Sequence, residues 1–395
     1  MDQRVAEKKR GSVPRRIAIY TDAMAWGGAE VYMTELAEGL KSAGYETPLF
    51  VADRPAVDAW VADLEERGFA VTRFRHGKEF DPRVFAEAGR FLAGFELVHF
   101  NKTHPRNCLP GIAAARAAGA RSIVATEHLA EAPVSRYPFG RQIVTAYVRR
   151  SNRQVDRTIA VSELSRRMLI ENYSLPADRV VAIPNGIDAT EFDRELDTAS
   201  VRAGLGLRES DLTAVLVGAL IERKGQRVAL EALAMLSERL PNLRMVFVGD
   251  GEKAEDYRRV ANELGVADRV VWAGFRRDVP AVLQAADMLI LPSDIECLPF
   301  VILEAMGARL PVVASDVGGV SEEVEDGVTG RLVPPRNARA LADAMADVLG
   351  RTDRGAAMGE AGRRKLERDF SIEACVGAVL DLYDEVCSAS ERSGR

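Results

Sequence analysis

The chain has 395 residues, of which 47% are hydrophobic and 28% charged, and its formal net charge is -6. This composition is typical of a globular protein, and the length is too great for one ordinary core, so we expect two domains. No apolar run approaches the ~20 residues that span a bilayer, which argues against an integral membrane protein. The negative net charge gives no general reason to expect nucleic-acid binding.

The N-terminal segment is rich in Lys and Arg and has no apolar core like that of a signal peptide, so secretion is unsupported. We expect residues 1–15 to form a disordered basic tail. The cysteines are scattered without metal-ligand spacing, as in proteins of a reducing compartment, which predicts a cytoplasmic protein. They are Cys108, Cys297, Cys375 and Cys387.

Short apolar segments alternate with helix-length stretches through residues 16–190, which we take as the N-terminal domain. A strand opens it at Arg16, a Gly-containing loop follows, and a helix is expected over 31–40. Further strands are expected at 47–52, 70–74, 97–100, 122–126, 157–161 and 180–183. Alternating strands and helices predict a parallel sheet.

Gly27 and Gly28 lie between the first strand and its helix. Glycine permits close backbone approach, and backbone N–H groups there can hold a phosphate. An ordinary tight turn would use the same residues, so both interpretations remain open.

Histidines lie near two of the strand ends. His128 follows the strand 122–126 directly, so its imidazole can serve as a hydrogen-bond donor or proton carrier in a cleft. His99 and His104 flank another strand end, and His76 has no motif around it. A single histidine is more often structural than catalytic.

The segment from Arg136 to Arg157 interleaves arginines with apolar residues and predicts a basic amphipathic helix. We favour a helix that packs its apolar face on its own domain and leaves its arginines in solvent. Contact with a membrane surface or with an anionic acceptor remains an alternative.

A polar stretch over residues 189–210 marks the boundary between domains. Residues 191–370 form the expected second domain, and residues 371–395 a C-terminal helix that can return to pack on the first. Its strands are expected at 213–217, 244–248, 270–273, 288–292, 311–314 and 330–333. The fold class is therefore α/β, with two doubly wound parallel-sheet domains facing a central cleft, because ligands of such sheets bind beyond the carboxyl ends of the strands.

Two cations and a glycine motif follow the first two strands of the second domain. Arg223 and Lys224 emerge where a diphosphate can be bound, although a surface Arg-Lys pair is usually only solvated. Gly249 and Gly251 match a dinucleotide fingerprint, which keeps an NAD-dependent enzyme as an alternative. The fingerprint usually follows the first strand of such a domain, so we expect these glycines to let the chain pass close to a nucleotide base.

Two acids, Glu296 and Glu304, lie eight positions apart across an expected loop-to-helix junction. Pro299 suits the first helical turn, which leaves Cys297 and Leu298 in the loop. The acids can stand ~10 Å apart and hold the two ends of a sugar nucleotide, with the N–H groups of the helix start facing its diphosphate. Two ordinary surface acids are the default for such a match considered alone.

No Asp-x-Asp pair and no clustered His or Cys set occurs in the sequence, so we expect no metal and no bound cofactor.

Together these motifs resemble the retaining, nucleotide-sugar-dependent glycosyltransferases of family 4, which have two Rossmann-like domains in the GT-B arrangement. The resemblance covers nearly the whole chain. Its most specific stretch contains, in order, Pro292-Ser293, residues 296–304, residues 311–314, Gly318-Gly319 and residues 326–330. The other matches are Gly27-Gly28-Ala29, His128, Ser162, residues 184–188, Lys224-Gly225 and Gly249-Asp-Gly251.

The resemblance implies a role for each matched residue. Glu304 would hold ribose hydroxyls, Glu296 donor-sugar hydroxyls, and Lys224 with the Gly27-Gly28 loop the diphosphate. His128 would lie beside the transferred sugar. The departing diphosphate would help to deprotonate the acceptor on the same face, which retains the anomeric configuration.

Two positions depart from the family pattern. Ala219 stands where the family usually has Arg, so one diphosphate cation is missing unless Arg223 replaces it. Cys297 stands where Gly or Ser usually follows Glu296. A catalytically inactive partner of another transferase is therefore the main alternative to an enzyme that moves a hexose from UDP or GDP. The acceptor, such as a lipid-linked glycan or a secondary metabolite, and the oligomeric state stay open.

Overall fold

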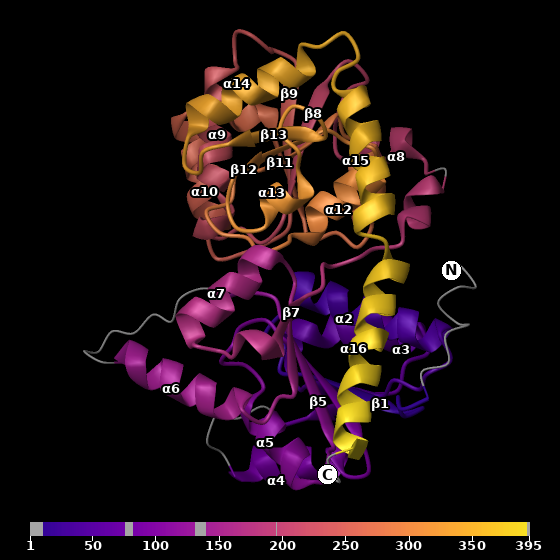
Figure 1. Ribbon diagram of the computed structural model, residues 1–395. Coiled ribbons are helices and arrows are strands. Elements are labelled where there is room, and N and C mark those ends of the chain that lie inside the picture. The colour runs from indigo at the N-terminus through magenta and orange to yellow at the C-terminus, as the bar shows by residue number, and fades with distance from the viewer. Residues whose placement is uncertain (1–10, 76–81, 131–139, 195, 393–395) are drawn as a thin grey trace. The chain divides into compact units, whose positions relative to one another are not determined.

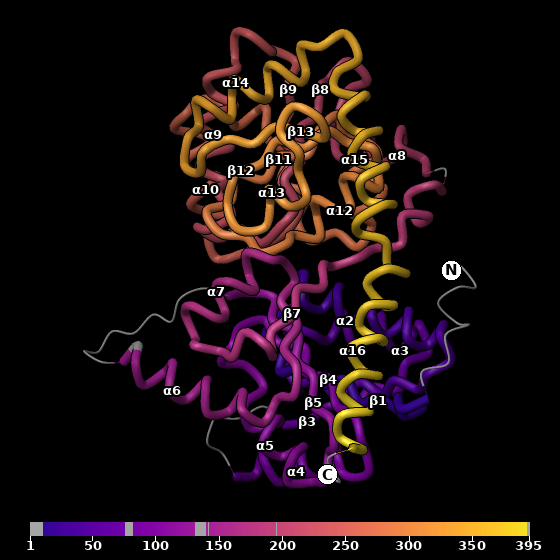
Figure 2. Tube along the Cα trace, in the orientation of Figure 1, coloured from indigo at the N-terminus to yellow at the C-terminus, as the bar shows by residue number. Residues whose placement is uncertain are grey.

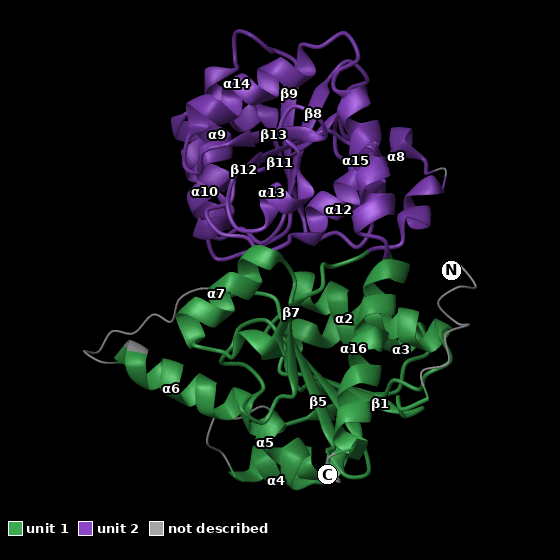
Figure 3. Cartoon of the chain, viewed as in Figure 1, with its two compact units in different colours: residues 1–186, 372–395 green, residues 187–371 purple. Residues whose placement is uncertain are grey.

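The computed structural model describes residues 11–75, 82–130, 140–194 and 196–392. His76, Arg136 and most of the expected basic tail lie outside the described residues. The chain forms two compact units, residues 1–186 with 372–395 and residues 187–371 (Figure 3). Because the last segment belongs to the first unit, the chain passes from one unit to the other near residue 186 and again near residue 371 (Figure 2).

Unit 1 is built on a parallel sheet with the strand order β3-β2-β1-β4-β5-β6-β7. The order runs outward from β1 in both directions, so the sheet is doubly wound and its direction of winding changes between β1 and β4. The strands are β1 (Ile17–Thr21), β2 (Leu49–Ala52), β3 (Val71–Phe74), β4 (Leu97–Lys102), β5 (Ser122–Glu127), β6 (Arg157–Ala160) and β7 (Val180–Ala182).

Helices follow most strands of unit 1, as parallel connections require. They are α2 (Gly28–Ser42), α3 (Asp58–Glu66), α4 (Pro82–Leu92), α5 (Leu109–Ala117), α6 (Gly140–Asn152), α7 (Glu163–Tyr173) and α16 (Ile372–Arg392), with short 3₁₀ turns η1 (Pro55–Val57) and η2 (Ala177–Arg179). The C-terminal helix α16 lies against α2 (Figure 1). A Cβ at Gly39 would lie 2.3 Å from a methyl carbon of Val376, so glycine allows this close packing.

Unit 2 repeats the design with the strand order β10-β9-β8-β11-β12-β13, again parallel. Its winding changes direction between β8 and β11. The strands are β8 (Leu212–Val217), β9 (Leu243–Val248), β10 (Val270–Gly274), β11 (Met288–Leu291), β12 (Val312–Ser315) and β13 (Gly330–Val333).

The helices of unit 2 are also mostly strand-to-strand connections. They are α8 (Thr198–Gly204), α9 (Gln226–Met235), α10 (Ala254–Glu263), α11 (Val279–Gln284), α12 (Phe300–Gly307), α13 (Val320–Glu323), α14 (Ala338–Leu349) and α15 (Ala356–Asp369), with 3₁₀ turns η3 (Ala189–Asp193), η4 (Glu222–Lys224) and η5 (Ala267–Arg269). Each unit has its own apolar core under its own sheet.

Some predicted boundaries were wrong. The strand predicted to end at Phe100 continues to Lys102, because its polar end pairs with β5 in the sheet interior. His99 therefore lies within a buried strand and not at its end. Pro299 is the residue that caps α12 and not part of its first turn, since its backbone is extended (φ -75°, ψ 119°). No helix in the described part of the chain is long and apolar enough to cross a membrane.

Candidate active site

The loops after β8 and β11 meet where the sheet of unit 2 changes its direction of winding. Doubly wound sheets bind ligands at this point, beyond the carboxyl ends of the strands. The loop after β8 carries Lys224 in η4, and the loop after β11 carries Ser293 and Glu296. The topology therefore brings together residues that are far apart in the sequence.

Lys224 and Glu296 form an ion pair in this place. The Lys224 Nζ atom donates to Glu296 Oε1 over 2.6 Å, and the Ser293 hydroxyl donates to the same oxygen over 2.7 Å. The side chains of Lys224 and Glu296 are only 14% and 8% exposed. A largely buried pair of this kind is held in one geometry, so it presents a fixed cation and a fixed carboxylate beside each other.

Two glycines shape the position of Lys224. The backbone of Gly218 has φ +152°, and the aliphatic stem of Lys224 passes about 3.7 Å from where a Cβ would stand. Gly225 has φ +72°, and a Cβ there would lie 2.0 Å from the carbonyl oxygen of Pro292. Glycine is therefore required for the close approach of the β8 loop to the β11 loop.

Arg223 contacts the other loop as well. Its Nη1 atom lies 3.4 Å from the carbonyl oxygen of Ile295, the residue before Glu296, and its own carbonyl accepts from the Asp294 N–H over 2.8 Å. Ala219, which replaces the usual arginine, accepts a hydrogen bond from the Gln226 side chain through its carbonyl.

Gly249 and Gly251 lie after β9 and pack on the β8 loop. A Cβ at Gly249 would lie 2.2 Å from the Gly218 carbonyl oxygen, and one at Gly251 would lie 2.5 Å from that of Leu220. Backbone packing against this neighbouring loop is thus sufficient to explain both glycines. Their predicted contact with a nucleotide base stays a prediction.

The β12 loop supports Glu296 from another direction. Gly318 has φ +58°, and a Cβ there would fall on the carbonyl oxygen of Glu296. Glu323, on α13, is fully buried, and neither of its carboxylate oxygens has a hydrogen-bond partner among the described residues. Burial, and then the charge of Glu296, raises the pKa of Glu323 well above its usual value. A protonated Glu323 avoids placing two charged carboxylates side by side.

Helix α12 carries the second acid of the predicted pair. Cys297, Leu298 and Pro299 are buried in the loop that leads from Glu296 to the helix. Glu304 lies in the middle of α12. Burial, and then the charge of Glu191, raises the pKa of Glu304 to about 7. Its charge therefore changes within the physiological pH range.

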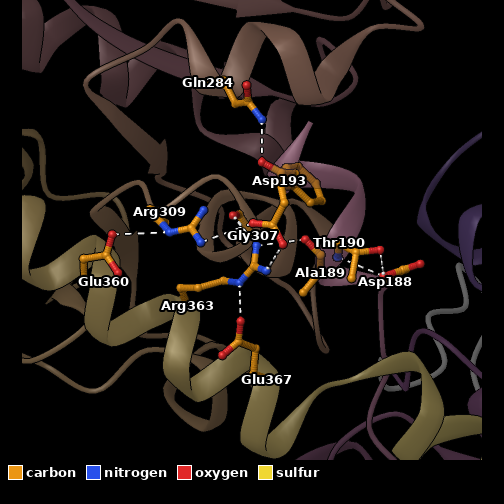
Figure 4. Close-up of polar contacts among 11 residues, drawn as sticks. Asp188, Ala189, Thr190, Asp193, Gln284, Gly307, Arg309, Glu360, Arg363 and Glu367 are labelled. Atoms are coloured by element: carbon orange, nitrogen blue, oxygen red, sulfur yellow. Dashed lines mark hydrogen bonds and ion pairs between the residues drawn. The ribbon is translucent and has the colours of Figure 1, made fainter. Parts of the chain in front are cut away.

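An arginine that the sequence analysis did not single out holds the end of α12 (Figure 4). The Arg363 guanidinium donates to the carbonyl oxygens of Gly307 and Ala189 over 3.0 and 2.8 Å, and to the carboxylates of Asp193 and Glu367 over 2.8 and 2.6 Å. It thus joins α15, the last residue of α12 and the turn η3. No motif signalled this role, because its partners are backbone carbonyls and ordinary surface acids.

The Gly27-Gly28 loop of unit 1 is exposed and lies at the start of α2. The Gly27 N–H donates to the Glu30 carboxylate over 2.9 Å, which caps the helix. Burial raises the pKa of Glu30 to about 8. Gly27 has an extended backbone (φ -153°) that does not itself require glycine. The predicted contact of this loop with a diphosphate stays a prediction.

His128 is linked to that loop through Asn101. The Asn101 amide nitrogen donates to the Ala29 carbonyl over 2.8 Å, so its oxygen faces His128 Nε2, 2.8 Å away. His128 must then carry its proton on Nε2. Burial, and then the charge of His99, lowers the pKa of His128 to about 3. At neutral pH the ring is uncharged, which favours the role of hydrogen-bonding group over that of proton carrier.

His99 has a structural role in unit 1. Its Nδ1 atom contacts the Tyr383 hydroxyl of α16 over 2.5 Å, and its Nε2 atom contacts the Thr126 hydroxyl over 2.9 Å. Burial lowers the pKa of His99 to about 3. Nearby, Lys102 and Glu127 form an ion pair with fully buried side chains. These polar groups fix the carboxyl ends of β4 and β5, next to Asn101 and His128.

The described residues contain no group of three or more His, Cys, Asp or Glu that is able to hold a metal ion.

Comparison with known proteins identifies the family of each half of the chain. Residues 26–191 match the profile described as Glycosyltransferase Family 4, and residues 197–365 match that of Glycosyl transferases group 1.

Similar proteins include the GDP-mannose-dependent alpha-(1-6)-phosphatidylinositol monomannoside mannosyltransferases of two mycobacteria. The Mycobacterium tuberculosis protein is 30% identical over 370 residues, which cover 90% of this chain and 94% of that protein. The Mycolicibacterium smegmatis protein is 34% identical over 72% of this chain and 75% of its own length. A D-inositol 3-phosphate glycosyltransferase of Nocardia farcinica is 30% identical over 88% of this chain and 84% of that protein.

Among solved structures, Anabaena Alr3699/HepE in complex with UDP and glucose superposes with a TM-score of 0.82 at 22% identity, covering 94% of this chain and 99% of the other. Sucrose-phosphate synthase from Thermosynechococcus elongatus superposes with a TM-score of 0.75, also at 22% identity, covering 95% of this chain and 100% of the other. These likenesses concern the fold. With two doubly wound parallel-sheet units and relatives of at least 30% identity along most of its length, the chain belongs to glycosyltransferase family 4 and has the two-domain, Rossmann-like GT-B fold.

Proposed function

We propose that the protein moves a hexose from GDP- or UDP-hexose to a hydroxyl group of an acceptor and retains the anomeric configuration, without a metal ion. The Lys224–Glu296 pair carries this proposal, because it offers one cation and one carboxylate at the point where a doubly wound sheet binds ligands. The cation suits a diphosphate, and the carboxylate suits sugar hydroxyls.

Both groups gain a partner when the donor binds. A diphosphate oxygen would share Lys224 with Glu296, and the free oxygen of Glu296 would accept from the sugar. As the bond between the sugar and the diphosphate breaks, negative charge builds up on the diphosphate, where a fixed Lys224 stabilises it more in the transition state than in the ground state. Arg223, beside the same loop at Ile295, is the candidate to replace the arginine missing at position 219.

The properties of the two candidate bases, Glu296 and His128, favour retention of the anomeric configuration. Glu296 Oε1 already accepts hydrogen bonds from Lys224 and Ser293, and a histidine with a pKa near 3 is a poor base at neutral pH. We therefore propose that the acceptor oxygen attacks the anomeric carbon on the face from which the diphosphate leaves. The acceptor proton passes to a diphosphate oxygen, and the products are the glycoside and the nucleoside diphosphate.

The names of the relatives supply candidates for both substrates. The mycobacterial relatives are named for GDP-mannose and a phosphatidylinositol mannoside, and the Nocardia relative for D-inositol 3-phosphate. A glycosylated or phosphorylated polyol, free or attached to a lipid, is accordingly the acceptor class that we propose.

The donor is tested by thermal stabilisation with UDP, GDP, ADP, TDP and NAD, because a ligand that binds only the folded state raises the melting temperature. We expect GDP or UDP to stabilise the protein, Lys224→Met to lose this effect, and Arg239→Met to keep it. Arg239 is a matched control because it is an exposed cation of unit 2 paired with Asp343. Stabilisation by NAD alone, or equal stabilisation of both variants, would reject the proposed donor site.

The stereochemistry is tested by proton NMR of the product formed from an α-linked donor. An α-linked product is expected, and a β-linked product would exclude retention. Activity that is unchanged in EDTA is the expected result for a metal-independent enzyme, and its loss would contradict that part of the proposal.

Ala219 favours one second candidate, an inactive partner that keeps the fold and binds nucleotide. Arg223→Ala distinguishes the two. Loss of an existing activity in this variant would assign the role of the missing arginine to Arg223. Nucleotide binding by the wild-type protein without transfer to any phosphorylated or glycosylated polyol would favour the inactive partner.

A further inference from the structure

The imidazole ring of His128 is supported from two sides in unit 1. Its Nε2 atom faces Asn101, and the ring of Tyr32 packs against it edge-on, with ring centroids 4.7 Å apart and an interplanar angle of 66°. Aromatic pairs prefer this edge-to-face geometry, so the contact is favourable and directional. Tyr32 belongs to α2, the helix that begins at Gly28, and is 1% exposed. A displaced Tyr32 would therefore release His128 on one side.

Tyr32 is anchored to the sheet by its hydroxyl. The Tyr32 oxygen lies 3.1 Å from the hydroxyl of Thr126, which is fully buried near the carboxyl end of β5. The ladder continues to His128, whose N–H donates to the Lys102 carbonyl over 3.0 Å. Side chains two positions apart in a strand lie on one face, as those of Thr126 and His128 do. Tyr32 thus spans both positions, with its hydroxyl at Thr126 and its ring at His128.

Thr126 itself is held by buried polar groups that end on the C-terminal helix. Its hydroxyl lies 2.9 Å from His99 Nε2, and His99 Nδ1 lies 2.5 Å from the Tyr383 hydroxyl of α16. His99 and Tyr383 are both fully buried. We call Tyr383, His99, Thr126 and Tyr32 the buried chain. It runs from α16 through β4 and β5 to α2, and Figure 1 shows the two helices side by side.

The hydrogen bonds of the buried chain have one direction. Burial lowers the pKa of His99 to about 3, so its neutral ring has one donor nitrogen and one acceptor nitrogen. His99 therefore donates to one of its two hydroxyl neighbours and accepts from the other. Loss of either neighbour leaves a ring nitrogen without a partner, and the remaining bonds then rearrange. A change at Tyr383 is in this way transmitted to Thr126 and Tyr32.

The buried chain also attaches two helices to the sheet, but their packing does not depend on it. The helices approach each other closely at Gly39, where a Cβ would lie 2.3 Å from Val376, and both bury apolar side chains. Polar groups are costly to bury, and apolar residues of similar shape would fill the space without this cost. A fully bonded polar chain defines positions more closely than apolar packing does. This favours a role in fixing the group that the chain contacts, which is His128.

We propose that Tyr32 is a positioning residue for His128, and that the buried chain makes the position of His128 depend on Tyr383 of the C-terminal helix. Helix α16 then contributes to the reaction although none of its residues has to touch a substrate. This inference rests on the proposed function, because the position of His128 matters for transfer only if this residue lies beside the transferred sugar.

Nitrogen-15 and carbon-13 NMR of the imidazole rings tests the positioning directly. The chain has four histidines, so four sets of ring signals are expected, and a His128→Gln variant assigns those of His128. Tyr32→Phe and Tyr383→Phe each remove one hydroxyl of the buried chain. Tyr173→Phe is the matched control, because Tyr173 is also fully buried in unit 1 and its hydroxyl lies 3.3 Å from His104 Nε2.

We expect both variants of the buried chain to shift the ring signals of His128, and the control to shift those of His104 alone. Attachment of the helices without positioning predicts a different result, in which Tyr383→Phe shifts the signals of His99 and leaves those of His128 unchanged. The inference is overturned if the His128 signals in Tyr32→Phe are those of the wild type. The dependence on α16 is overturned if they are unchanged in Tyr383→Phe.

Steady-state kinetics of the same variants measure the consequence for transfer. Tyr32→Phe should lower kcat about 10-fold and leave KM for the nucleotide sugar within about twofold, as for a misplaced group in an otherwise intact site. Combining Tyr32→Phe with Tyr383→Phe should lower kcat no further, because both changes act through one chain, whereas independent effects would multiply. Wild-type kcat in Tyr32→Phe, or losses that multiply, would overturn the inference. Thr126→Ser, which keeps the hydroxyl, should retain both kcat and the His128 signals.

Circular dichroism and the melting temperature check that each variant is folded. If Tyr32→Phe does not fold, Thr126→Val removes the same hydrogen bond from the side of the sheet and is judged by the same signals. Absence of transfer by the wild-type protein would reject the proposed function. The positioning of His128 is judged by the ring signals, which require no substrate, so the two failures are distinguishable.

Discussion

Replacing Arg363 by methionine should loosen the end of α12 much more than the same change at Arg309. Methionine retains most of the aliphatic stem of Arg363, whose side chain is only 6% exposed, and removes its four hydrogen bonds. Arg309 belongs to the same network but is 40% exposed, and among the described residues its guanidinium pairs with Asp193 and Glu360, over 3.2 and 3.3 Å. The two variants therefore separate a buried cation from an exposed one.

The expected loss of stability follows from the hydrogen-bond acceptors that each variant leaves without a donor. Without the guanidinium, the buried carbonyl of Gly307 loses its donor, at a cost of about 2 kcal/mol, and the partly buried carbonyl of Ala189 about 1 kcal/mol. Asp193 and Glu367 are half exposed and regain water, so each adds well under ~1 kcal/mol. We expect about 3 kcal/mol for Arg363→Met and at most about 1 kcal/mol for Arg309→Met.

Hydrogen exchange followed by mass spectrometry measures this effect locally. A loss of about 3 kcal/mol corresponds to roughly 100-fold faster exchange in peptides that cover η3 and α12, if these open as one unit. Peptides from the sheet of unit 1 serve as an internal reference. The reasoning is refuted if Arg363→Met exchanges no faster than Arg309→Met in these peptides.

Three further predictions follow from the site. Gly318→Ala should destabilise unit 2 by several kcal/mol more than Gly327→Ala, as measured by urea unfolding. Both residues have positive φ, but only at Gly318 would a Cβ meet the Glu296 carbonyl. Equal losses of stability in the two variants would contradict this reasoning. Glu304 has a raised pKa of about 7, so its contribution to stability is present below pH ~4.5 and is lost as the pH rises through 7. Affinity for a nucleoside diphosphate should rise over the same pH range. Glu191→Gln should move the midpoint of this rise to lower pH, and an unchanged midpoint would argue against the coupling of the two acids. His128 should remain neutral and Nε2-protonated from pH 5 to 8 in nitrogen-15 NMR of the imidazole rings, and a midpoint near 6.5 would refute the arrangement with Asn101.

The sequence predicts the fold well because its apolar segments are short, numerous and separated by helix-length stretches. The strand from Gly330 to Val333 has the predicted bounds, and most others differ by one or two residues at their ends. One of the larger differences occurs where polar residues continue a buried strand, as Asn101 and Lys102 do. Polar side chains normally signal the end of a strand, and only tertiary contacts reveal the exceptions.

The site was predictable in part for a related reason. Lys224 and Glu296 both follow apolar strands, so the rule that ligands bind at strand ends placed both among the candidates, and the family resemblance then suggested their roles. Their direct contact was not predictable, because it depends on the spatial order of β8 and β11. Asn101 and Arg363 left no signal, since each acts through a backbone carbonyl or a neighbouring side chain. Both can be recognised only from the distances that the fold creates.

Each unit contains an ion pair between a lysine and a glutamate that is largely or fully buried. In unit 2, Lys224 and Glu296 neutralise each other when no ligand is bound, and the donor has to compete with an existing ion pair. In unit 1, the pair of Lys102 and Glu127 has fully buried side chains. At Lys224, donor binding therefore adds a partner to an existing ion pair. Salt should therefore weaken nucleotide binding at Lys224 only modestly, because a largely buried cation is screened less than an exposed one, and a steep loss of affinity on adding salt would contradict this.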